Sequence, residues 1–253
     1  MAARPRPMER GGWPALVTGQ APDAPTFLES YLEAISRSEL LDAGSKPNPV
    51  RMTALLRVIS RNIATETSQA KLAEEANIGA NQIRSYLDAL ERTFVLEPQP
   101  AWSPKLRSAV RKRVKSKWHF VDPSIAVSAL GASPSKLLND LETMGFMFES
   151  LCVRDLRVYA SPERGTVFHY RDETGLEVDA VVELPDGTWS AFEVKLGGAD
   201  AIDKAAASLR ALSTKVDDQT QARLGTLNVL TAGNVSYPRS DGVNVVSLGH
   251  LGP

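Results

Sequence analysis

The chain has 253 residues, 43% of them hydrophobic, which suffices for one large or two ordinary domains with a buried core. Its formal net charge of −1 gives no overall indication of a nucleic-acid partner. A single cysteine, Cys152, excludes an internal disulfide, and no hydrophobic run approaches the roughly 20 residues of a membrane span. We therefore expect a cytoplasmic protein without a membrane partner.

Residues 1–48 are expected to form an N-terminal helical segment. The first ten residues are basic and proline-rich, and they lack the apolar stretch of a signal peptide. After the sequence Gly11-Gly12-Trp13-Pro14, a helix is predicted from about Ala24 to Leu41. Gly44-Ser45-Lys46-Pro47 should end it.

Residues 49–122 carry the pattern of a winged-helix domain. Helices are predicted over 51–63, 69–76 and 80–94, followed by strands over 95–98 and 118–121. The glycine-containing turn at 77–79 gives residues 72–87 the pattern of a helix-turn-helix, whose second helix can enter a major groove. Only Arg84 on the exposed side of that helix is strongly cationic. A module that docks proteins and reads no bases is an equally good interpretation.

A basic run follows, without a single acid. If it forms the wing, its side chains contact DNA phosphates without reading the base sequence. The alternative is a solvated charged loop. The basic residues of this run are Lys105, Arg107, Arg111, Lys112, Arg113, Lys115 and Lys117.

Residues 123–253 are predicted to form a second domain that contains a sheet. Asp122 should cap a helix that starts at residue 123, and a longer helix over 137–159 carries Glu149. A strand over 166–171, two hairpin strands, a helix over 199–212 and strands over 227–231 and 243–248 complete the domain. The predicted fold class is α/β (α+β), with a winged-helix domain followed by an αβββαβ domain.

The hairpin is the most informative stretch. Its two strands flank Pro185-Asp186-Gly187, a sequence suited to a tight turn. Because side chains alternate along a strand, Asp179 on the first strand and Glu193 and Lys195 on the second should converge when the polar faces pair. Carboxylates are the ligands that Mg²⁺ prefers, and a nearby lysine can stabilise charge during attack on a phosphodiester.

This pattern of an acid followed by Glu-x-Lys resembles the restriction-endonuclease-like nuclease superfamily. The resemblance implies catalytic roles for Asp179, Glu193 and Lys195, with Asp179 and Glu193 holding Mg²⁺ or Mn²⁺. It also implies that an acid on an earlier helix assists, and Glu149 matches that acid. The alternative is a solvated ion pair on an exposed strand.

Much of the chain also resembles the C-terminal region of prokaryotic AAA-type ATPases, in which a winged helix precedes a nuclease-like domain of unknown function. No Gly-x-x-x-x-Gly-Lys-[Ser/Thr] phosphate loop occurs, so we expect no nucleotide partner and no ATPase activity, and we expect a truncated or stand-alone derivative. The matching residues are Gly11-Gly12-Trp13-Pro14, Asp88-Ala89-Leu90-Glu91, Ser103-Pro104-Lys105, Phe120-Val121-Asp122-Pro123, Phe148-Glu149, Tyr170-Arg171, Glu177-Val178-Asp179 and Glu193-Val194-Lys195.

Two functions remain open at this point. The first is a DNA-associated, metal-dependent nuclease. The second is a non-catalytic module, derived from such an ATPase, that binds DNA or docks a protein partner or a second copy of the chain.

Overall fold

The computed structural model describes the chain except for residues 1–7, 9, 22, 38–47, 105–114 and 253. The chain forms two compact units. The helical unit is built from Pro5–Pro98 and Lys117–Ser150, and the sheet unit from Gln99–Ser116 and Leu151–Pro253. Helices and sheets are mixed along the chain, which confirms the predicted α/β class. None of the described helices combines the length and the hydrophobicity needed to cross a membrane.

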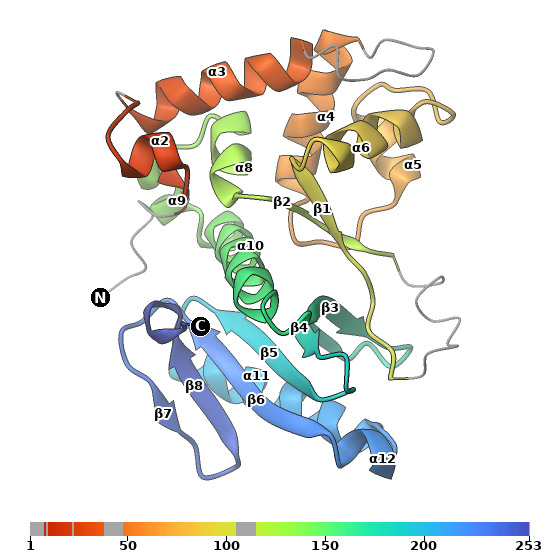
Figure 1. The fold of residues 1–253 in the computed structure, drawn as a ribbon, viewed down its shortest axis with the longest axis vertical. Coiled ribbons are helices and arrows are strands. Elements are labelled where there is room, and N and C mark those ends of the chain that lie inside the picture. The colour runs from red at the N-terminus through yellow and green to blue at the C-terminus, as the bar shows by residue number, and fades with distance from the viewer. Residues whose placement is uncertain (1–7, 9, 22, 38–47, 105–114, 253) are drawn as a thin grey trace. The chain divides into compact units, whose positions relative to one another are not determined.

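The helical unit contains the predicted order of a winged helix, namely three helices followed by two paired strands (Figure 1). Glu66 adds an isolated antiparallel bridge to Lys117. The helices of this unit up to the paired strands are α2 (Pro14–Val17), α3 (Ala24–Arg37), α4 (Pro49–Arg61), α5 (Gln69–Glu75) and α6 (Ile83–Arg92). The paired strands are β1 (Leu96–Gln99) and β2 (Lys117–Phe120). After β2 come α8 (Pro123–Ala129), α9 (Pro134–Asn139) and α10 (Leu141–Ala160), which continues into the sheet unit.

Helix α8 explains why the units differ from the predicted domain boundaries after residues 48 and 122. It packs against α3, α4 and β2, so it belongs to the helical unit. The predicted long helix over 137–159 is also divided. Asp140 leaves the helical conformation between α9 and α10, and its Oδ1 accepts a hydrogen bond from the backbone N–H of Thr143 at 3.0 Å.

Short polar side chains set where the helices begin. Asn48 Oδ1 accepts a hydrogen bond from Val50 N at 2.9 Å, and Ser68 Oγ accepts one from Lys71 N at 3.2 Å. These contacts satisfy N–H groups that a helix leaves without an internal partner. Helix α6 begins later than predicted, at Ile83, because residues 79–82 form a turn in which Gly79 O accepts from Gln82 N. Its predicted inward residues Ile83, Leu87 and Leu90 are buried.

Two motifs far apart in sequence meet within the helical unit. Asp122 Oδ1 caps α8 through Ser124 N at 2.9 Å, while Oδ2 accepts a hydrogen bond from Gly12 N at 2.9 Å. Trp13 Nε1 donates to Ser124 Oγ at 2.9 Å. A Cβ at Gly11, whose φ is +69°, would lie 2.6 Å from Asp122 Oδ1, so only glycine allows this close approach. The contact holds the N-terminal segment against α8.

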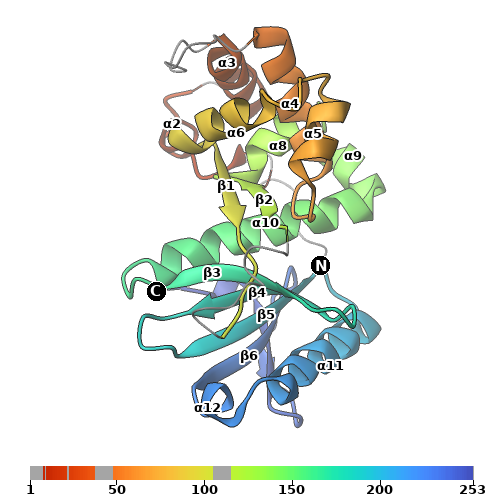
Figure 2. The same ribbon diagram turned by 90° about the vertical axis from the view of Figure 1, so that its right-hand side faces the viewer.

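The sheet unit contains six strands in the order β3-β4-β5-β6-β8-β7 (Figures 1 and 2). Strands β3, β4 and β5 form antiparallel hairpins, and β5 runs parallel to β6 after a crossover through α11. This is the predicted order of helix, three strands, helix and strand. The elements are β3 (Thr166–Arg171), β4 (Glu177–Glu183), β5 (Trp189–Lys195), α11 (Ala199–Lys215), α12 (Asp218–Gln221), β6 (Leu224–Thr231), β7 (Tyr237–Pro238), β8 (Val243–Ser247) and η1 (Leu248–His250).

The core of this unit lies between the sheet and α11, which runs along one face of it (Figure 2). Leu209 and Leu212 of α11 pack with Ala191, Val229 and other buried strand residues. The predicted hairpin turn is present, with Leu184 N donating to Thr188 O at 2.8 Å and Gly187 at a φ of +84°. A glycine in this left-handed position is typical of a three-residue hairpin loop.

Candidate functional site

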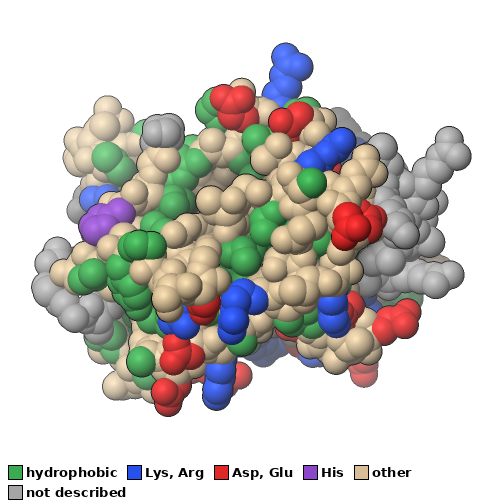
Figure 3. Space-filling view, turned by 90° about the horizontal axis from the view of Figure 1, so that it is seen from below, with side chains coloured by type: hydrophobic (Ala, Val, Ile, Leu, Met, Phe, Trp, Pro, Cys, Tyr) green, Lys and Arg blue, Asp and Glu red, His purple; other side chains and the backbone are tan. Residues whose placement is uncertain are grey.

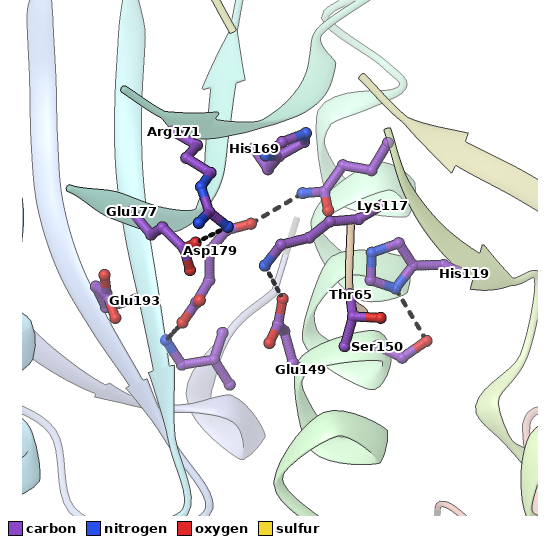
Figure 4. A network of polar contacts seen from close by, with 12 residues as sticks. Thr65, Lys117, His119, Glu149, Ser150, His169, Arg171, Glu177, Asp179 and Glu193 are labelled. Carbon is purple, nitrogen blue, oxygen red and sulfur yellow. Dashed lines mark hydrogen bonds and ion pairs between the residues drawn. The ribbon is translucent and has the colours of Figure 1, made fainter. Parts of the chain in front are cut away.

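Three charged side chains of the sheet unit meet at the ends of two neighbouring strands. Asp179 lies on β4 and Glu193 on β5 (Figure 4). Lys195 is the last residue of β5. The register pairs Val181 with Ala191, which brings the predicted polar faces together. The convergence predicted from alternation along the hairpin is therefore present. We call Asp179, Glu193 and Lys195 the acid–lysine cluster.

Hydrogen bonds fix the cluster. Lys195 Nζ lies 2.6 Å from Glu193 Oε2 and 3.2 Å from Asp179 Oδ2. Asp179 Oδ2 also accepts a hydrogen bond from the backbone N–H of Val194 at 2.8 Å, which ties β4 to β5. Exposure differs within the cluster, because the Glu193 side chain is 7% exposed and the Lys195 side chain 30%. The lysine is therefore the member with the most access to solvent.

The cluster has a distinct electrostatic state. Burial, together with the nearby Asp179 carboxylate, raises the pKa of Glu193 to about 8. Burial acts to lower the pKa of Lys195, but the charges of Asp179 and Glu193 outweigh it and raise that pKa above its usual value. Burial and the neighbouring Asp179 charge therefore disfavour the ionised form of Glu193, while Lys195 favours it.

This donor set fits a divalent cation. Mg²⁺ is commonly held by one or two carboxylates, with water and substrate phosphate completing its shell. A second positive charge would relieve the repulsion between Asp179 and Glu193 that raises the pKa of Glu193. Within the described part of the chain there is no group of three or more His, Cys, Asp or Glu side chains that could hold a metal. In the acid–lysine cluster, the two carboxylates of Asp179 and Glu193 are the groups that would bind a metal, with water or substrate supplying the other ligands.

Gln99 supports the site and was missed from the sequence. It is fully buried, and its Nε2 donates to the backbone carbonyls of Asp179 and Phe168, each at 3.0 Å. The ladder between β3 and β4 shifts its register between Phe168 and Tyr170, and Gln99 donates to the Phe168 carbonyl at this irregularity. Its position between two prolines in a strand pattern was the only signal, because a lone glutamine predicts no partner.

Glu177 does not join the cluster. It is an exposed residue of β4 and forms an ion pair with Arg171 on β3 (Figure 4). Glu177 thus takes part in an ion pair at the solvent-exposed edge of the hairpin and not in the cluster.

Glu149 belongs to the helical unit and has a partner that the sequence did not predict. Lys117 Nζ donates to Glu149 Oε1 at 2.7 Å, and both side chains are about nine-tenths buried (Figure 4). Beside them, His119 Nδ1 lies 3.2 Å from Ser150 Oγ. The assisting role of Glu149 stays a prediction.

The residues predicted to contact nucleic acid differ in their exposure and in their partners. Lys117 is removed from that set, because its side chain is buried and pairs with Glu149. Lys115 is exposed, and Arg84 is exposed but forms an ion pair with Asp88 at 2.7 Å. On the face in Figure 3, cationic and anionic side chains are interspersed, and neither sign gathers into a continuous patch among the described residues. Lys105, Arg107, Arg111, Lys112 and Arg113 lie outside the described residues.

Comparison with protein families adds two matches. Residues 4–136 match the family described as a domain of unknown function (DUF8612), and the chain belongs to this family. Residues 144–251 match a second domain of unknown function, DUF4143, which is found at the C-terminus of AAA-ATPase-associated proteins. That second match agrees in part with the resemblance noted from the sequence. No curated protein matches the chain.

Proposed function

We propose that this member of the DUF8612 family is a DNA-associated protein that hydrolyses phosphodiester bonds with a divalent metal and has no ATPase activity of its own. The observation that carries the proposal is the acid–lysine cluster. Two carboxylates on neighbouring strands share one lysine, and one of them has a pKa raised to about 8. Strongly perturbed groups of this kind are more frequent at functional sites than elsewhere.

Each residue of the cluster has a role in this reaction. Mg²⁺ or Mn²⁺, held by Asp179 and Glu193, would supply a Lewis acid and lower the pKa of a bound water. Lys195 remains protonated, because its pKa is raised, and can donate hydrogen bonds to a water or to a phosphate oxygen. The backbone N–H of Val194 donates to the Asp179 carboxylate, and Gln99 Nε2 donates to the Asp179 backbone carbonyl. These two hydrogen bonds position the Asp179 carboxylate before substrate binds.

A second candidate function is a non-catalytic module that binds DNA or docks a protein. Lys195 already neutralises one of the two acids, which is enough to hold a structural cluster together. The exposed side of α6 also favours protein docking over insertion into a groove, since Arg84 is paired with Asp88 on the same helix. In this case the acid–lysine cluster would be a structural remnant of a nuclease.

A plasmid-nicking assay with Mn²⁺ separates the two functions. The wild-type protein should nick DNA, whereas Asp179→Asn and Glu193→Gln should not, because each removes a metal-binding carboxylate. Lys195→Met should slow cleavage about 10²–10³-fold, the typical effect of removing one stabiliser of transition-state charge. Glu177→Gln is the matched control, because this residue lies on the same strand and pairs with Arg171.

The control variant should keep the wild-type rate, and thermal melts should show that all variants fold. Absence of cleavage by the wild-type protein on both single- and double-stranded DNA, with Mg²⁺ and with Mn²⁺, would leave the binding module as the function.

A further inference from the structure

The carboxyl ends of β5 and β6 lie next to each other beside the acid–lysine cluster. Lys195, the last residue of β5, is in register with Thr231, the last residue of the parallel strand β6. Residues in register on neighbouring strands place their side chains on the same face of the sheet. Val229, two residues before Thr231, packs in the core with α11. Thr231 therefore points to the side of the sheet that α11 covers.

The Thr231 hydroxyl has an unusual environment. The residue is 4% exposed, and its hydroxyl makes no hydrogen bond with any of the residues that the structure describes. Although the residue is largely buried, its hydroxyl oxygen is not one of the fully buried polar atoms of the described chain, so solvent can reach it. Ser247, the register neighbour on β8, differs, because its Oγ donates to Gly233 O at 2.6 Å. The Thr231 hydroxyl is therefore available to a ligand.

The N-terminus of α11 supplies further donors at the same end of the sheet. This helix of 17 residues begins at Ala199, and Gly198 at its N-cap offers no side chain to accept from the first N–H groups. Ile202 N makes the first helical hydrogen bond, to Gly198 O at 3.1 Å. In a strand–helix–strand crossover, the helix N-terminus lies above the carboxyl ends of the strands, where anionic ligands bind.

Space for a ligand is present above this turn. Gly197 and Gly198 have φ angles of +148° and +94°, and a Cβ on either would meet no atom within 4 Å. The backbone between Lys195 and α11 is therefore open to close approach. This loop joins Lys195 to the uncapped amides of α11, and Thr231 lies at the same end of the sheet because it is in register with Lys195.

We propose that Lys195, the Thr231 hydroxyl and the first amides of α11 form a cradle for one phosphate group of a nucleic-acid backbone. The proposal rests on the proposed function, and it names how the substrate is held. An ammonium, a hydroxyl and backbone N–H groups at a helix N-terminus are the usual donors to phosphate oxygens. Asp200, exposed in the first turn of α11, opposes the phosphate charge and limits the affinity.

Amide chemical shifts test the cradle without any cleavage. A single-stranded oligonucleotide and, separately, inorganic phosphate are titrated into the full chain in EDTA, while backbone amides are followed by NMR. The oligonucleotide should shift the amides of residues 197–201. Thr231→Val should weaken this binding about tenfold, since one hydrogen bond to a charged group is lost. Asp200→Asn should strengthen it.

Thr226→Val is the matched control, because this exposed threonine lies on the same strand and bonds to Ser190. It should leave the affinity unchanged. Equal affinity in Thr231→Val and wild type, or no shift at residues 197–201, overturns the cradle. Equal affinity for inorganic phosphate and the oligonucleotide overturns its assignment to nucleic acid. This titration measures binding and not cleavage, so the proposed nuclease activity is tested independently by the nicking assay.

Discussion

Two lysine–acid sites of this chain differ in how deeply they are buried. In the helical unit, Lys117 pairs with Glu149, and the two side chains are 9% and 11% exposed. In the sheet unit, Lys195 is 30% exposed and is shared by two acids, Asp179 and Glu193. The first arrangement is suited to holding β2 against α10. The second places two carboxylates beside a lysine that solvent can reach, which is the basis of the proposed metal site.

The largest expected effect is on folding in the helical unit. Lys117→Met should lower the free energy of unfolding by about 3–5 kcal/mol, because it removes the buried ammonium that donates to the Glu149 carboxylate. Lys195→Met is the matched variant and should cost less, since solvent reaches that site and Glu193 can take up a proton instead. Urea denaturation of both variants measures the difference.

The double variant Lys117→Met with Glu149→Leu completes this test. Replacing both charges by apolar groups should recover part of the lost stability, because both charges of the buried pair are then removed together. Equal destabilisation by Lys117→Met and Lys195→Met would mean that the two sites do not differ as their burial indicates.

The next effect concerns metal in the sheet unit. If Asp179 and Glu193 hold Mn²⁺, a metal concentration of about 100 times Kd should stabilise the folded state by about 2.7 kcal/mol. Asp179→Asn should abolish this gain in stability. Lys117→Met should show the same gain as the wild-type protein, although it is less stable without metal. Thermal melts with and without Mn²⁺ report the gain, and an identical shift in Asp179→Asn would exclude this site as the origin.

The smallest effect comes from a third pair, Asp172 and Lys215, which is more exposed. Partial burial acts to raise the pKa of Asp172, but hydrogen bonds from Lys215, Thr174 and Leu176 outweigh it and hold the pKa well below its usual range. Asp172 therefore contributes stability above its unfolded-state pKa of 3.8, and this contribution is lost as the pH falls toward its folded-state pKa.

Melting curves between about pH 2 and pH 6 should show this loss in the wild-type protein. Asp172→Asn should be less stable at pH 6 and should show a shallower acid dependence. If stability falls equally with pH in the two proteins, Asp172 does not contribute to the loss of stability in acid.

The hairpin is a region whose structure could be predicted from the sequence. Alternation along two strands and a Pro-Asp-Gly turn leave only a few registers, and all of those with paired polar faces bring Asp179 near Glu193 and Lys195. Helix positions such as Leu87 and Leu90 were equally predictable, since their spacing determines the buried side. Caps at Ser68 and Asp122 followed from the side chains themselves.

The sequence by itself therefore determined the order of the main helices and strands, the turn and the three residues of the acid–lysine cluster, because these depend on local periodicity and short-range hydrogen bonds. Only the tertiary structure decided which partners distant residues find. Lys117 looked like part of a cationic run, but folding buries it against Glu149, 32 residues away. Gln99 and Thr231 carried no local signal either. Their roles follow from strand register and burial, which arise only when segments far apart in the sequence pack together.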